Sequence, residues 1–230
     1  LITEESTDPD EVPTPSGIIY FEEGVCKCPE ASEGYTEVID QITYTAVDDA
    51  SIRSQISVKN YKLCTTLVTE MESLFLSNST FNEDINFWDT SNVTTMRQLF
   101  QGARAFNQEL GDWDTSKVTD MEAMFQQATS FNQEIGDWNT SKVTSMRAMF
   151  KEASVFDQPL ANWDTAKVTD MGSLFEDARA FNQDIGAWLT NQVTDMSHLF
   201  HKAMKFDQAL ENWDTSRVTT MEAMFQQAIS

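Results

Sequence analysis

Tryptophan spacing constrains this chain more than any other feature, because all six tryptophans are 25 residues apart: Trp88, Trp113, Trp138, Trp163, Trp188 and Trp213. A phenylalanine stands seven residues before each of them. Methionines from Met71 to Met221 keep the same step, and each is followed four residues later by a phenylalanine. Several residue types would not keep the same 25-residue spacing over so much of the chain by chance. The pattern therefore predicts a tandem repeat, in which each unit buries its apolar side chains against its neighbours.

Each repeat divides into two halves. Projected backwards, the frame begins at Ile56, so seven units occupy residues 56–230. The second half of the third unit has apolar residues at i, i+3, i+4 and i+7, a spacing typical of one face of a helix: Met121, Met124, Phe125 and Ala128. Thr119 and Glu122 match a helix capping box. In the first half, Leu110 and Trp113 precede turn-forming residues, which leaves room for one short strand.

One strand and one short helix per repeat predict an α/β solenoid of the leucine-rich-repeat type, with seven strand–turn–helix units. Neighbouring strands lie about 4.8 Å apart, whereas packed helices need about 8–10 Å. We therefore expect the helix side to fan out, giving a curved rod with a parallel sheet on its concave face. The Phe, Trp, Leu or Ile, and Met positions should form buried columns along the rod.

The N-terminal region differs from the repeats. Residues 1–16 are acidic and proline-rich, and they predict a tail or linker. Residues 17–55 predict a small β+α cap, since solenoids need their first unit covered. Within this cap, residues 35–47 resemble two β segments joined at Asp40 and Gln41, and Asp49 is a candidate cap for a helix that carries Ile52 and Ile56.

The formal charge of −22 excludes several classes of function. Nucleic acids and anionic membranes reward lysine and arginine, so we expect neither as a partner. No apolar run reaches the 18 residues that a membrane-spanning helix requires, so we expect no membrane insertion. Because the chain starts at Leu1 without an apolar leader, it is expected to be a processed secreted protein or a piece of a longer precursor.

The three cysteines, Cys26, Cys28 and Cys64, are disulfide candidates. In a secreted chain, Cys64 is expected to pair with either Cys26 or Cys28, and the third thiol then stays free or bridges to another chain. The alternative, a zinc site, needs a fourth ligand. The only histidines, His198 and His201, lie far along the chain, so a disulfide is favoured.

Asn-x-Ser/Thr sequons make three asparagines candidates for glycosylation, and we expect the first to be the most exposed: Asn78, Asn92 and Asn139. Asp89, Asp114, Asp164 and Asp214 directly follow a tryptophan, as a calcium ladder requires. Asn139 and Leu189 interrupt that ladder, which favours a turn-forming role instead. A second column is expected to pair loop backbone groups between repeats: Asn82, Asn107, Asn132, Asp157, Asn182 and Asp207.

Nothing in the repeat predicts catalysis. His198 and His201 have a metal-compatible i, i+3 spacing on the expected sixth helix but no carboxylate or cysteine frame, so we interpret them as partly exposed helix residues. No nucleophile motif or glycine-rich phosphate loop breaks the repeat symmetry. We therefore expect a protein that is not an enzyme and that takes no cofactor.

The repeat Phe-Asn-Gln-(Asp/Glu)-(Ile/Leu)-Gly-x-Trp-Asp-Thr-Ser-x-Val-Thr-x-Met resembles that of the BspA-like leucine-rich-repeat surface proteins. The resemblance covers residues 56–230. It implies an extracellular protein, either secreted or attached to the cell surface, with a role in adhesion or surface structure. It implies no catalytic residues.

Two functions are expected from these observations. The first is a structural subunit that assembles head-to-tail with copies of itself into a fibre. This expectation comes from the uncapped last unit, whose apolar face provides five candidates for the assembly contact: Phe206, Leu210, Trp213, Met221 and Phe225. The alternative is an adhesin that binds a host or microbial surface protein or a glycan through the concave sheet, at exposed positions such as Gln108, Glu109 and Asp112.

Overall fold

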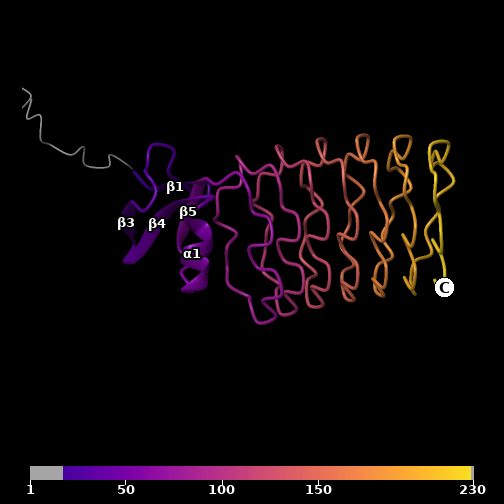
Figure 1. Cartoon of the computed structure of the whole chain (residues 1–230), viewed down its shortest axis with the longest axis horizontal. Helices are drawn as coiled ribbons and strands as arrows, with labels where there is room; N and C mark the ends of the chain where they lie inside the picture. Colours follow the sequence, from indigo (N-terminus) through magenta and orange to yellow (C-terminus); the bar gives the residue numbers. More distant parts are fainter. Residues whose placement is uncertain (1–17, 229–230) are drawn as a thin grey trace, which may run out of the picture.

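The computed structural model describes residues 18–228. The chain forms a small β+α region at one end of the long axis, followed by a row of coils, each 25 residues long, that lie side by side (Figure 1). The acidic tail expected at residues 1–16 lies outside the described residues.

The β+α region holds every named strand and the single helix of the described chain. Its elements are β1 (Tyr20–Glu22), β2 (Val25–Lys27), β3 (Thr36–Ile39), β4 (Ile42–Asp48), α1 (Ile52–Ser57) and β5 (Leu63–Leu67). Strands β1 and β2 form an antiparallel pair. The second sheet has the order β3-β4-β5, antiparallel between β3 and β4 and parallel between β4 and β5. We call residues 18–55 the cap.

The two β segments and the helix expected in the cap are present. Asp40 and Gln41 join β3 to β4 with positive φ angles of 49° and 68°, the backbone of a tight hairpin turn that matches strand twist. Helix α1 carries both isoleucines, and Ile52 is fully buried. The expected helix cap is wrong, because Ser51 is the N-cap residue and Asp49 hydrogen-bonds the first repeat instead.

The predicted strand–turn–helix solenoid of leucine-rich-repeat type is wrong. Between residues 81 and 228 the structure has no helix and no extended strand, only turns and isolated parallel bridges such as Asp120↔Ser145. Where the helix was expected, Ala123 and Gln127 have positive φ angles of 54° and 60°. A helix cannot pass through left-handed residues every four positions. The apolar spacing that mimics a helix comes from consecutive tight turns.

Hydrogen bonds between repeats replace those within a helix. The Met121, Ala123, Phe125 and Gln127 amides all donate to carbonyls of the following repeat, Phe125 to Met149 O at 2.9 Å. The capping box is also absent, since Thr119 donates its hydroxyl to Thr94 O. Parallel pairing of the main chain between repeats therefore connects the row of coils.

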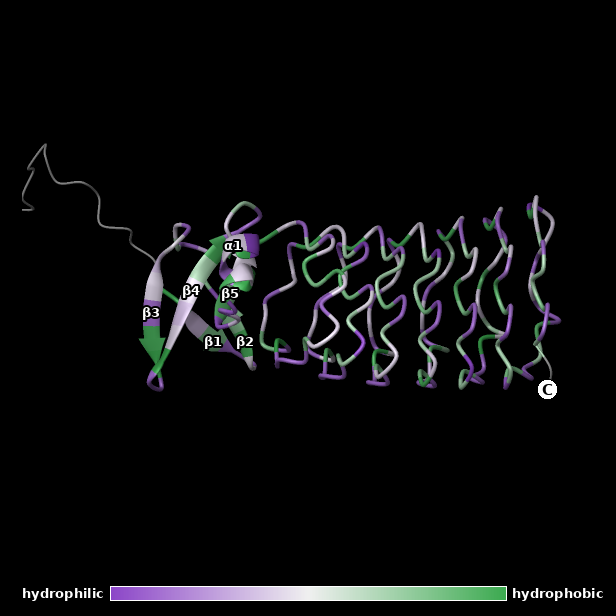
Figure 2. Cartoon of the chain, turned by 60° about the horizontal axis from the view of Figure 1, so that its bottom comes forward, coloured by the Kyte–Doolittle hydropathy of each residue, from purple (hydrophilic) through white to green (hydrophobic). Residues whose placement is uncertain are grey.

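The apolar columns are buried as expected. The Phe, Val and Met positions of the middle repeats have no exposed surface, and Trp138 has 4%. Ring centroids of neighbouring repeats are 5.5 Å apart for Phe100 and Phe125, 5.9 Å for Phe106 and Phe131, and 6.4 Å for Trp113 and Trp138. Because no helices widen one side of the row, the columns have similar spacings. The expected fanned rod with a concave sheet therefore does not form. Hydrophobic and hydrophilic residues alternate within every coil (Figure 2).

Candidate functional site

Polar side chains line one side of the row in register with the apolar columns. The predicted amide ladder is present: the Asn107 amide donates to Asn82 Oδ1 at 2.8 Å, and the Asn132 amide donates to Asn107 Oδ1 at 2.9 Å. The same bond recurs at Asp157, Asn182 and Asp207. The ladder supplies an acceptor for a backbone donor in each repeat.

Glutamines next to the ladder donate hydrogen bonds through Nε2 to the preceding repeat. Gln108 Nε2 donates to Asn82 O at 3.0 Å, and Gln158 Nε2 donates to Asn132 O at 3.0 Å. Gln133 Nε2 donates to both oxygens of Asn107. Each glutamine thus uses its donor within the row, and its Oε1 has no donor among the described residues. These oxygens give the surface an excess of hydrogen-bond acceptors.

Three adjoining hollows of about 280, 500 and 480 Å³ follow this surface across the second to fifth repeats. The first two share Asn86, Glu109 and Gln133, and the last two share Gly111 and Glu134. We call them together the polar groove. Five carboxylates line it, with no lysine, arginine or histidine: Asp84, Glu109, Asp112, Glu134 and Asp137. The groove therefore suits a ligand that is cationic or rich in hydrogen-bond donors.

Sequence variation confines the polar groove to part of the row. The position of Glu109 and Glu134 is occupied by Pro159 in the next repeat, and that of Asp112 and Asp137 by Asn162. The repeated glutamines suggest a uniform surface, which hides this change in the neighbouring acidic positions. A comparison of exposed positions repeat by repeat is the signal that finds the groove.

The aspartates that follow the tryptophans have the predicted role in turns. Asp114, Asp164 and Asp214 each accept a hydrogen bond through Oδ1 from the amide two residues later. Within residues 18–228, no group of three or more His, Cys, Asp or Glu side chains is placed to hold a metal ion.

Asp89 differs from the other aspartates in this position. It is 2% exposed, and it accepts hydrogen bonds from Lys27 Nζ at 2.9 Å and Thr66 Oγ1 at 2.7 Å. Burial raises its pKa, but the hydrogen bonds from Ser91, Lys27 and Thr66 outweigh burial and hold the Asp89 pKa below its ordinary value. This ion pair connects β2 of the cap to the second repeat.

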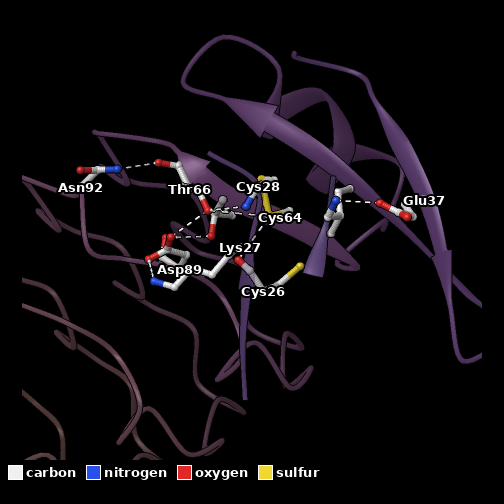
Figure 3. Close-up of a disulfide and its surroundings, with 10 residues drawn as sticks. Cys26, Lys27, Cys28, Glu37, Cys64, Thr66, Asp89 and Asn92 are labelled. Carbon is white, nitrogen blue, oxygen red and sulfur yellow. Dashed lines mark hydrogen bonds and ion pairs between the residues drawn. A yellow bond between two sulfur atoms is a disulfide. The ribbon is translucent and has the colours of Figure 1, made fainter. Parts of the chain in front are cut away.

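A disulfide joins Cys28, directly after β2, to Cys64 of β5, close to the Lys27–Asp89 pair (Figure 3). Cys26 is the third cysteine and remains a free, buried thiol. Burial, together with the Asp89 charge, raises the Cys26 pKa to about 12. A thiol that stays protonated at neutral pH is a poor nucleophile, so Cys26 is a core residue rather than a reactive one.

The sequons differ in exposure from what the sequence predicts. Asn139 is exposed, whereas Asn78 and Asn92 are half-buried. Asn92 also donates from Nδ2 to Thr66 O at 2.8 Å. The expected ranking, with Asn78 as the most exposed, is therefore wrong, because Asn139 is the most exposed of the three.

The candidates for the assembly contact range from buried to exposed. Phe206 is 6% exposed and stacks on Phe200, so it presents little surface for an assembly contact. Leu210 and Trp213 are half-buried, and Met221 and Phe225 are 42% and 50% exposed.

The two histidines lie side by side with ring centroids 5.5 Å apart. His201 Nδ1 is 3.5 Å from Glu176 Oε1, which is close enough for an ion pair if the imidazole is protonated but long for a hydrogen bond. No further carboxylate or cysteine joins them in a metal site within the described residues. Within the same residues, no helix has the length and apolarity needed to cross a membrane.

Comparison with known proteins gives a family. A family profile described as "Mycoplasma protein of unknown function, DUF285" matches residues 44–151 and 133–230. No curated protein and no solved structure matches the chain. The two matched segments overlap and together cover the end of the cap and all of the repeats. The chain therefore belongs to the DUF285 family.

Proposed function

We propose that this chain is a non-enzymatic structural module of an extracellular protein, in which stacked repeats provide a stiff spacer. One observation carries the proposal: each junction between repeats is built from the same contacts. Tryptophan Nε1 donates to a carbonyl of the preceding repeat, Trp138 to Leu110 O and Trp163 to Ile135 O, both at 3.0 Å. Uniform junctions are expected of a spacer, whereas a catalytic site needs a local departure from the pattern.

The extracellular location rests on three observations. A disulfide joins Cys28, directly after β2, to Cys64 of β5, and disulfides persist in oxidising compartments. The surface is strongly acidic, which favours solubility. The repeat resembles that of BspA-like surface proteins. Intact source cells treated with a membrane-impermeant amine reagent should therefore yield labelled peptides containing the exposed Lys117 or Lys142. Labelling that requires cell lysis would contradict the location.

Head-to-tail fibres are one form that this structural role can take. The exposed Met221 and Phe225 need a partner surface in such a fibre. The first repeat of another copy does not offer one, since its own cap covers it. Electron microscopy of concentrated protein tests the fibre, and only monodisperse particles would contradict it without affecting the spacer role.

An adhesin remains the second candidate because of the polar groove. In an extended peptide, alternate side chains lie about 6.6 Å apart. This spacing is comparable with the 5.9 and 6.4 Å between ring centroids of successive repeats at the flanking pairs Phe106–Phe131 and Trp113–Trp138. Lysines at alternate positions would thus meet Glu109 and Glu134 in turn. We propose an extended basic peptide as the ligand in this case.

Fluorescence anisotropy with a labelled Lys-Ser repeat peptide tests the adhesin. The double variant Glu109→Gln/Glu134→Gln should weaken binding by roughly tenfold. The matched control, Glu30→Gln/Glu33→Gln, removes the same charge from exposed positions in the cap and should bind like the wild type. Equal weakening by both variants would indicate diffuse charge attraction and would contradict a site in the groove.

A further inference from the structure

Each repeat donates hydrogen bonds to backbone carbonyls of the repeat before it. The first repeat has no preceding repeat to supply these carbonyls. The Thr94 amide and hydroxyl both donate to Thr69 O, at 2.8 and 3.2 Å. The same pair of bonds recurs between successive threonines as far as Thr219. Thr69 belongs to the first repeat, and no earlier repeat presents a threonine carbonyl to it.

Asp49 of the cap occupies the place of that carbonyl. Its Oδ1 accepts the Thr69 amide at 2.7 Å and the Glu70 amide at 2.9 Å. Its Oδ2 accepts the Thr69 hydroxyl at 2.6 Å. A carboxylate thus takes both donors that a backbone carbonyl takes elsewhere in the row, and it takes one more. Bonds to an ionised acceptor are stronger than those between neutral groups.

Arg53 supplies a hydrogen-bond donor to the first repeat, whereas Asp49 supplies acceptors. Within the row, the Ser73 amide donates to Arg97 O at 2.9 Å, and the Ala123 amide donates to Arg147 O at 2.8 Å. The corresponding carbonyl of the first repeat is that of Glu72, and Arg53 Nη2 donates to it at 2.6 Å. Both residues are positioned by α1. Arg53 lies in the helix, and Asp49 lies three residues before its first residue, Ile52.

We propose that Asp49 and Arg53 form a clamp that stands in for a preceding repeat: the clamp sets the position of the first coil and closes its face to pairing with another repeat. Burial of Ile52 between the two residues fixes α1 against the row. Open main-chain edges are where repeat and sheet proteins join one another. A cap that satisfies the edge with charged side chains prevents this joining at one end.

Amide hydrogen exchange of the full chain tests the first half of the proposal. In Asp49→Ala, the Thr69 and Glu70 amides should exchange roughly tenfold faster, whereas the Thr119 and Thr144 amides should be unchanged. Asp49→Asn keeps one acceptor oxygen and should give a smaller rise at the same amides. The control Asp40→Asn removes an equal charge from the exposed β3–β4 turn and should change neither. Unchanged exchange at Thr69 in Asp49→Ala, or an equal rise in every repeat, would overturn the clamp.

Sedimentation velocity tests the second half. The double variant Asp49→Ala/Arg53→Ala should sediment as larger species than the wild type at equal concentration. The wild type and the Asp40→Asn control should sediment alike. Identical sedimentation of all three proteins would overturn the role of the clamp in closing this end.

Discussion

At the scale of single residues, the repeats are joined by polar side chains that serve the backbone of a neighbour. Asn132 Oδ1 accepts the Asp157 amide at 2.9 Å, while the Asn132 amide donates to Asn107. Aspartate replaces asparagine in two repeats of this ladder. The slot therefore requires an acceptor oxygen rather than a particular charge, a requirement that the sequence pattern reveals without the structure.

Asn132→Ala should destabilise the chain by about 1–2 kcal/mol, because the Asp157 amide loses its acceptor in a half-buried position. Asn132→Asp keeps the acceptor and should change the free energy of unfolding by less than about 0.5 kcal/mol. Urea denaturation measures both values. An equal loss in the two variants would show that the oxygen is not what the slot requires.

Trp138→Phe should cost about 1–3 kcal/mol, since the variant loses both ring volume and the bond from Nε1 to Leu110 O at 3.0 Å. Trp213 makes the equivalent bond to Ile185 O but is half-buried. Trp213→Phe should therefore cost less in the same thermal unfolding experiment. A larger loss at Trp213 would contradict burial as the source of the difference.

At the scale of the elements, the repeat is a coil of tight turns whose apolar spacing resembles that of a helix. Met121, Met124 and Phe125 are buried as the helical pattern predicts. The pattern does not reveal the positive φ angles of Ala123 and Gln127, because neither residue is a glycine. The sequence thus predicts which side chains are inside the row, whereas the backbone path depends on pairing with the next repeat.

Glycine leaves room for the backbone of the following coil at Gly136. A Cβ on Gly136 would lie 2.7 Å from Pro159 O of the following repeat. Gly136→Ala should therefore destabilise the protein by about 1–3 kcal/mol through overpacking. Gly111→Ala is the matched control, since a Cβ there meets no atom within 4 Å. Similar midpoints of denaturation for the two variants would contradict the close approach.

At the scale of the whole molecule, the charge of −22 opposes compaction. Local carboxylates act in the other direction: hydrogen bonds outweigh burial and hold the pKa values of Asp49 and Asp89 below their ordinary range. Because the folded pKa is the lower one, each such group contributes stability above its unfolded pKa, and that contribution is lost as the pH falls through the folded pKa.

The free energy of unfolding should rise with salt at pH 7, since salt screens the repulsion. It should fall as the pH decreases below about 4, where the hydrogen-bonded aspartates take up protons. Asp89→Asn should flatten that decrease. Denaturation at a series of pH values gives the profile. A stability that keeps rising towards pH 2 would contradict a stabilising role for these carboxylates.

The surface was less predictable than the core. Repeat spacing predicts the buried columns and the asparagine ladder, because both recur in nearly every unit. The polar groove and Asp49 do not recur. The groove depends on acidic residues present in only some repeats. Asp49 lies in the cap, outside the repeats, and contacts Thr69, which is 20 residues later in the chain. A repeat-by-repeat comparison of the sequence can find the acidic positions of the groove, whereas the contact between Asp49 and Thr69 requires the three-dimensional arrangement.

An NMR measurement of scalar couplings across hydrogen bonds tests the pairing between repeats most directly. We predict a coupling between the amide nitrogen of Phe125 and the carbonyl carbon of Met149, in the next repeat. The equivalent coupling should join Phe150 to Leu174. A coupling from Phe125 to the carbonyl of Met121, as in an α-helix, would contradict the pairing between repeats on which the proposed spacer rests.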